Sequence, residues 1–130
     1  MPTHIKIIHA HEFIKATPEG QLDLNESIKL LIDITYASDS MVDYEIIVDT
    51  RKMPTIMSIT DLYYLAAELA KFSKHLLHKT AILCPIERLD YAEFFANCSQ
   101  NRGFHMKVFT SYEGAMEWLL EPIRLTNENV

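Results

Sequence analysis

The stretch Tyr44–Leu62 constrains the fold more than any other part of the chain, because three local structures follow one another in it. Ile46–Val48 is a continuous apolar run, which is typical of a central strand with both faces covered. The polar segment Asp49–Arg51 follows at once, and after a proline-containing loop Ser58 precedes apolar residues at helical spacing. We therefore predict a strand, a loop at its carboxyl end and a helix start, which is where open α/β sheets bind ligands.

The rest of the chain alternates between strand-like and helix-like apolar patterns. Strands are expected over His4–His9, His11–Ala16, Glu45–Thr50, Thr80–Cys84 and His105–Phe109. Helices are expected from Asp23 or Asn25 to near Ser38, from near Thr60, over Leu89–Gln100, and from Ser111 to Pro122. The first two strands are expected to form an edge hairpin, with Thr17–Gly20 as a turn after it. The alternation predicts an α/β fold with a mostly parallel sheet.

Helical spacing also predicts which side chains each helix buries. For the first helix these are Leu24, Ile28, Leu31, Ile32 and Thr35, and for the second Leu62, Leu65, Ala66, Leu69 and Phe72. For the third helix they are Tyr91, Phe94, Phe95 and Cys98, and for the fourth Ala115, Met116, Trp118 and Leu119. A chain of 130 residues can bury one core, so we expect one domain over 1–122 and a tail over 123–130.

Composition weighs against two classes of partner. The net charge of −6 argues against a nucleic-acid-binding face. No apolar run approaches the ~20 residues that a membrane helix needs, so no membrane insertion is expected. The first residues lack the basic start and long apolar run of a signal peptide. We expect a cytoplasmic protein in which Cys84 and Cys98 stay reduced.

The familiar catalytic and cofactor motifs are missing from the sequence. No phosphate-binding loop can be built from the three glycines, Gly20, Gly103 and Gly114. His9 and His11 would share one strand face with His4 nearby, but solvated edge-strand histidines are the favoured interpretation over a metal site. His75 and His78 fall near a helix end, where a positive charge suits the helix dipole. We expect no catalytic residue, no metal and no cofactor.

Asp49 and Arg51 have the same parity at the strand end, so both would point the same way. One interpretation is a local ion pair that braces the loop. The other is a surface that binds an anion or a partner, formed by Asp49, Arg51, Ser58 and Thr60 beside the N-terminus of the next helix. The sequence leaves both open.

Three segments resemble the SpoIIAA-like branch of the STAS fold (sulfate transporter and anti-sigma-factor antagonist). They are the strand and loop Ile46–Arg51, the strand Thr80–Pro85, and Val108–Leu119 with its Trp-Leu ending. The resemblance covers nearly the whole chain. It implies a right-handed βα superhelix around a mostly parallel mixed sheet of about five strands, with about four helices. It also implies a non-catalytic interaction module.

The resemblance further implies a phosphorylated hydroxyl at the start of the helix after the central strand, as in bacterial anti-sigma-factor antagonists. Thr60 occupies the acceptor position. The surrounding residues depart from that family's DSSG-like setting, because this chain has Ser58, Ile59 and Asp61 around Thr60. A carboxylate beside an added phosphate would repel it.

Three functions remain open. The first is an interaction module that binds a protein partner and self-associates as a homodimer. The second is a binding protein for a small apolar molecule or an anion, held between a helix and the sheet. The third is a small enzyme using Asp49, Arg51 or a histidine, which the missing motifs disfavour. A large apolar cavity would favour the second.

Overall fold

The computed structural model describes residues 3–8, 13–18, 23–37, 45–53, 57–69, 71 and 79–121. The strands are β1 (Thr3–Ile8), β2 (Phe13–Pro18), β3 (Glu45–Asp49), β4 (Thr80–Leu83) and β5 (Met106–Phe109). The helices are α1 (Leu24–Ala37), α2 (Ile59–Leu69), α3 (Leu89–Gln100) and α4 (Tyr112–Leu120), and a 3-10 helix, Ile86–Arg88, precedes α3. The alternation confirms the predicted α/β class.

The five strands form one sheet in the order of the sequence, β1-β2-β3-β4-β5. β1 is antiparallel to β2, whereas β2 to β5 are parallel. The hairpin at the edge and the mostly parallel sheet were therefore both predicted correctly. One row of paired residues, Ile14, Ile46, Thr80 and Met106, crosses the parallel part of the sheet. It belongs to the face that carries most of the core.

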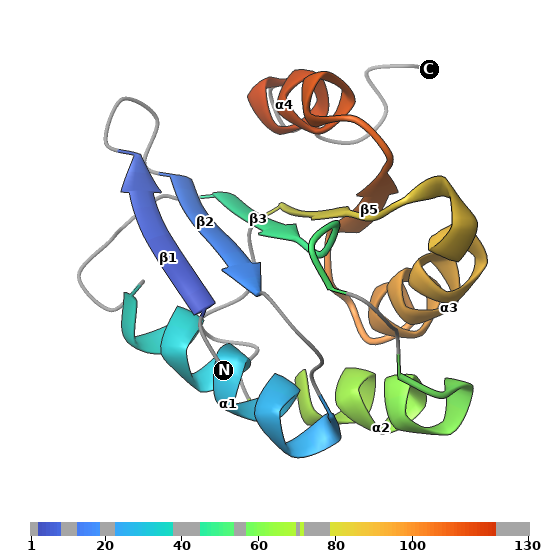
Figure 1. The fold of residues 1–130 in the computed structure, drawn as a ribbon. Helices are drawn as coiled ribbons and strands as arrows, with labels where there is room; N and C mark the ends of the chain where they lie inside the picture. The colour runs from blue at the N-terminus through green and yellow to red at the C-terminus, as the bar shows by residue number, and fades with distance from the viewer. Residues whose placement is uncertain are drawn as a thin grey trace.

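Helices cover the two faces of the sheet unequally (Figure 1). α1, α2 and α3 lie on one side, where Leu30, Leu69 and Ala96 pack with buried strand residues in the larger core cluster. α4 lies on the other side, where Ala115 and Leu119 pack with buried residues of β3 and β4 in a smaller cluster. Ile46 and Ile47 point to opposite faces and are both buried, so β3 is a central strand, as its apolar run predicted.

Local signals set three helix ends where we expected them. The Asp23 carboxylate accepts a hydrogen bond from the Glu26 backbone N–H at 2.8 Å, which caps the start of α1. Ser111 caps α4 by accepting from the Gly114 N–H at 3.1 Å. Gly103 follows α3 with a φ of 94°, a left-handed conformation that glycine adopts without strain.

The buried faces of α1 and α3 differ from the predicted ones. α1 buries Ser27, Leu30 and Ile34, while Ile32 is exposed. α3 buries Ala92, Ala96 and Ser99, while Tyr91 is exposed and Phe95 is only partly buried. In α1 two stripes of apolar residues fit helical spacing, and packing on the sheet selects one of them. In α3 small residues face inward, because they let the helix approach its neighbours closely.

The predicted turn at Thr17–Gly20 is wrong in its first half, because Thr17 and Pro18 lie in β2 and pair with His4 and Thr3. Proline is tolerated there at the last position of the strand. The buried face of α2 was predicted correctly at Leu62, Leu65, Ala66 and Leu69. Phe72, His9, His11, His75, His78 and the tail 123–130 lie outside the described residues.

Candidate functional site

Asp49 and Arg51 form a closely fitted ion pair at the carboxyl end of β3. The Asp49 residue is 4% exposed, and its side chain accepts from Arg51 Nε at 2.9 Å and from Arg51 Nη2 at 2.8 Å. The Arg51 backbone N–H also donates to Asp49 Oδ1 at 3.1 Å. The guanidinium keeps contact with solvent, since 40% of the Arg51 side chain is exposed. The ion pair that the sequence left open as one of two interpretations is therefore present.

Opposing effects act on the pKa of Asp49. Burial alone would raise this pKa, but the hydrogen bonds and positive charge of Arg51, helped by Lys15, hold it below its ordinary value. The pKa of Arg51 is raised, chiefly by its hydrogen bonds to Asp49, although partial burial acts the other way. The pair is therefore charged at neutral pH, and Asp49 is an acceptor rather than a proton donor.

Ser58 and Thr60 lie at the start of α2. Ser58 Oγ accepts from the Asp61 backbone N–H at 3.1 Å, so this hydroxyl caps the helix. Thr60 is exposed in the first turn. Asp49 has the parity of Ile47, which packs under α4, whereas α2 covers the opposite face. The structure thus brings Asp49 and Arg51 together and places Ser58 and Thr60 on the helix that follows.

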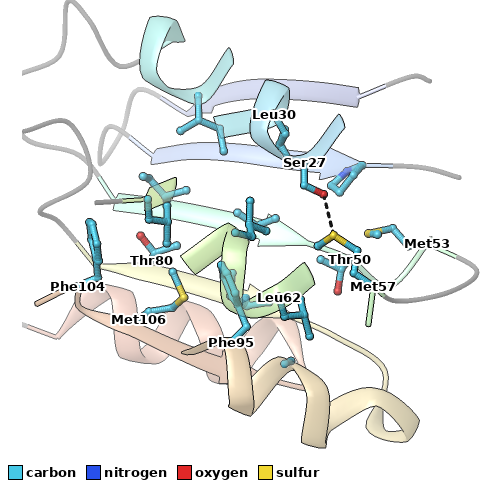
Figure 2. A pocket seen from close by; sticks show the side chains of 18 of the residues that line it. Ser27, Leu30, Thr50, Met53, Met57, Leu62, Thr80, Phe95, Phe104 and Met106 are labelled. Atoms are coloured by element: carbon cyan, nitrogen blue, oxygen red, sulfur yellow. Dashed lines mark hydrogen bonds between the residues drawn. The ribbon is translucent and has the colours of Figure 1, made fainter. Parts of the chain in front are cut away.

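A cavity of about 130 Å³ lies between the sheet and helices α1, α2 and α3 (Figure 2). Most of its lining is aliphatic, aromatic or thioether, with contributions from Leu30, Ile34, Ile46, Val48, Met53, Met57, Leu62, Leu65, Leu69, Ile82, Phe95, Phe104 and Met106. Its polar lining residues are Ser27, Thr50, Thr80 and Arg88. A largely apolar concave space with a few polar groups is the usual composition of a small-molecule site.

Ser27 and Thr50 lie at the end of the cavity near Met53 and Met57, away from Phe104 (Figure 2). The Ser27 hydroxyl donates to Met57 Sδ at 3.6 Å, across the gap between α1 and the segment before α2. The Thr50 hydroxyl donates to the Leu83 carbonyl at 2.6 Å, which joins the ends of β3 and β4.

Arg88 holds the loop after β3 in place. Its Nη2 donates to the Thr50 and Met53 carbonyls at 3.2 and 2.8 Å. Met53 is thereby fixed with its side chain buried in the cavity wall. The sequence left a pocket between a helix and the sheet open as an alternative but assigned no residues to it, because its lining comes from separate elements. The one local signal was Ser27, which stands on the same helical face as Leu30 and Ile34.

No cluster of histidine, cysteine or carboxylate side chains that could hold a metal occurs among the described residues. Nor does the described part of the chain contain a helix long and apolar enough to cross a membrane.

No protein-family model matches the chain, and no curated protein matches it. A solved structure from Shewanella loihica does, described as an uncharacterized protein of the DUF3478 family with a SpoIIAA-like fold. The two are 15% identical, the match covers 91% of this chain and 92% of that chain, and the TM-score is 0.62. A similarity at this identity shows the fold. The chain therefore has a SpoIIAA-like fold, as the three resembling segments predicted.

Proposed function

We propose that this protein is a non-catalytic binding module that holds a small apolar molecule between its sheet and helices α1 to α3. The observation that carries the proposal is the cavity of about 130 Å³ with its largely apolar wall. Protein interiors are normally packed as densely as organic crystals, with few voids larger than a water molecule. A cavity of this size is close to an engineered one of ~150 Å³ in another protein that binds benzene.

Energetics supports an occupant. An apolar molecule in this cavity leaves water and gains van der Waals contacts with the largely apolar wall. The folded state alone offers these contacts, so binding raises the stability of the fold.

Toluene tests this function, because it is apolar and of suitable size. We expect toluene to raise the melting temperature of the wild-type protein and to shift backbone amide signals of cavity residues in NMR spectra. Ala92→Met fills the cavity from α3, since Ala92 lines it, and should abolish both effects without loss of stability. Ala115→Met is the matched control, because Ala115 is buried under α4 on the other face.

We expect Ala115→Met to destabilise the fold by overpacking while the protein still binds toluene. Wild-type protein whose melting temperature and amide signals do not respond to saturating toluene would refute the proposed function.

A second candidate is a protein-partner surface at the carboxyl end of β3, which would combine the Asp49–Arg51 pair on the α4 side of the sheet with Ser58 and Thr60 at the start of α2 on the other side. The exposed edge of the Arg51 guanidinium favours it, since arginine can bind a carboxylate or phosphate with two parallel hydrogen bonds. Exposure of Thr60 also leaves its hydroxyl accessible to a kinase. We infer a cytoplasmic location for such a module, which fits the free thiols of Cys84 and Cys98.

The partner surface is tested by pull-down followed by affinity measurement. Arg51→Ala and Thr60→Ala should each weaken a captured partner, by about 2–5 kcal/mol if Arg51 is buried in the complex. Lys52→Ala is the control, because Lys52 is an exposed cation next to Arg51. Equal affinity for all three variants and the wild type would place the partner site elsewhere.

A further inference from the structure

The Ser27 hydroxyl makes an unusually weak hydrogen bond for a buried group. Ser27 is 5% exposed, lines the cavity, and donates to the thioether of Met57 at 3.6 Å. Thioether sulfur is a weak acceptor. An oxygen atom of a bound molecule would be a much better partner for this proton. Among the residues that the structure describes, Ser27 therefore has only a poor acceptor for its proton.

Thr50 offers the complementary group at the same end of the cavity (Figure 2). Its hydroxyl proton is directed to the Leu83 carbonyl at 2.6 Å, a short bond. The oxygen of a hydroxyl that donates still has lone pairs that can accept. A ligand group that accepts from Ser27 and donates to Thr50 would satisfy both residues. A neutral hydroxyl does this with one atom, whereas an ether or a ketone can only accept.

The rest of the cavity suits a ring. The cavity wall includes two methionines from the connection between β3 and α2, Met53 and Met57, and one from β5, Met106. Phe95 and Phe104 add aromatic surface. Thioether sulfur makes favourable contacts with aromatic rings, and methionine adapts its shape to what it packs against. In Figure 2 Phe104 and Met106 lie toward the end opposite Ser27 and Met57. The volume of about 130 Å³ limits the ligand to roughly one ring.

Taking the proposed function as its basis, we propose that the ligand is a small neutral phenol. Its ring lies among the methionine and phenylalanine side chains, and its hydroxyl bonds to Ser27 and Thr50. Arg88 contributes by holding the Thr50 and Met53 carbonyls, and therefore the wall of the site. A carboxylate on the ring would lose its hydration on entering a largely apolar cavity, which is costly.

Phenol and toluene are the paired probes, since they differ in the hydroxyl. Isothermal titration should show that Ser27→Ala raises the Kd for phenol about five- to tenfold, the loss of one hydrogen bond. The Kd for toluene should stay within about twofold, because toluene makes no such bond. Thr50→Val is a second, independent variant with the same expected pattern, should Ser27→Ala fold poorly.

The Met57 methyl group gives a second readout. In ¹³C-methyl NMR its signal should shift when phenol removes the Ser27 proton from the sulfur, and this shift should shrink in Ser27→Ala. Equal losses of phenol and toluene binding in both variants would overturn the phenol assignment while leaving an apolar site. Tighter binding of benzoate than of phenol would also overturn it, in favour of an anion at Arg88. Failure of every probe to bind the wild type would instead refute the proposed function.

Discussion

At the scale of single residues, Asp49 shows how a strand can end inside a protein. A buried carboxylate needs partners for both oxygens, and here one neighbouring residue supplies them through its guanidinium and its backbone N–H. A side chain that bonds to the backbone two residues later also fixes a turn. The Asp49–Arg51 pair therefore braces the loop that leads from β3 to the cavity wall at Met53, whatever else its exposed edge binds.

Acid should weaken this brace. The pKa of Asp49 is lower in the folded state, so its stabilising contribution is present above the ordinary carboxyl pKa and is lost as pH falls through the folded value. We expect Asp49→Asn to cost about 1–3 kcal/mol near pH 7 and to reduce the loss of stability below about pH 4. Urea unfolding at pH 7, 5 and 3 measures both effects.

Asp33→Asn provides the control for that experiment, because Asp33 is exposed on α1. It should change neither the stability at neutral pH nor the slope in acid appreciably. An Asp49→Asn protein with the same acid slope as the wild type would contradict the assignment.

The two cysteines should differ in reactivity. Cys84 is 1% exposed and burial raises the pKa of its thiol, so little of the reactive thiolate is present. Cys98 is partly exposed on α3. With a thiol reagent at pH 8, we expect Cys98 to react first and Cys84 only on unfolding. Titration of the denatured, non-reduced protein should find both thiols free, and finding none would contradict the expected reducing compartment.

At the scale of elements, α4 depends on one lysine from another part of the chain. Lys79, 5% exposed, donates from Nζ to the Trp118 and Glu121 carbonyls at 2.7 and 2.6 Å. These carbonyls belong to the end of the helix, where the dipole favours a cation. The same Nζ lies 5.1 Å from the centre of the Trp118 ring. Lys79 directly precedes β4, so it joins α4 to the central sheet.

Lys79→Met should destabilise the protein by about 2–3 kcal/mol, because two carbonyls at the end of α4 lose a charged donor. Lys107→Met is the matched control. Lys107 is exposed and its Nζ lies 5.8 Å from the centre of the same ring, so it shares the cation–π contact. Its loss should cost less than about 1 kcal/mol. Equal losses in denaturant melts would mean that the ring contact, and not the helix end, explains the role of Lys79.

The sequence predicted the positions of helices and strands better than it predicted which side of each helix is buried. Strands and helices were found because apolar period and caps are local signals, as at Asp23 and Ser111. The face of α1 was misjudged because its many apolar residues allow more than one stripe, and contact with the sheet chooses between them. Lys79 and Arg88 could not be predicted, since each acts on carbonyls far away in the sequence.

The two candidate sites also differ in how far the sequence predicted them. Asp49 and Arg51 are two residues apart, so strand parity predicted that they point the same way and allowed the ion pair that the structure shows. The cavity exists because α1, α2 and α3 do not completely fill the space above the sheet. The spacing of residues within one helix or strand cannot predict a gap between several of them. Ser27 was therefore interpreted only as part of a helix.

At the scale of the whole molecule, the inner strands of the sheet pair on both sides, whereas the two outer strands pair on one side. β3 lies in the middle of the sheet, while β1 and β5 are the outer strands. β1 is the longer of these two, and its antiparallel pairing with β2 runs along its whole length. An outer strand presents backbone N–H and C=O groups that can pair with another chain. Two-fold dimers are the commonest closed assembly, and an antiparallel β1–β1 contact would have that symmetry.

We accordingly expect the protein to form a two-fold dimer through β1, which multi-angle light scattering over a concentration series will detect. Neighbouring N–H groups of a strand point alternately to its two sides. Of Lys6→Pro and Ile7→Pro, one therefore removes an N–H that pairs with β2 and the other removes one on the outer edge. The variant that loses the N–H facing β2 should weaken the fold. The variant that loses the outer N–H should keep its circular dichroism spectrum and melting temperature nearly unchanged and convert the dimer to a monomer. A wild-type protein that stays monomeric at high micromolar concentration, or a dimer that survives both substitutions, would show that β1 is not the contact.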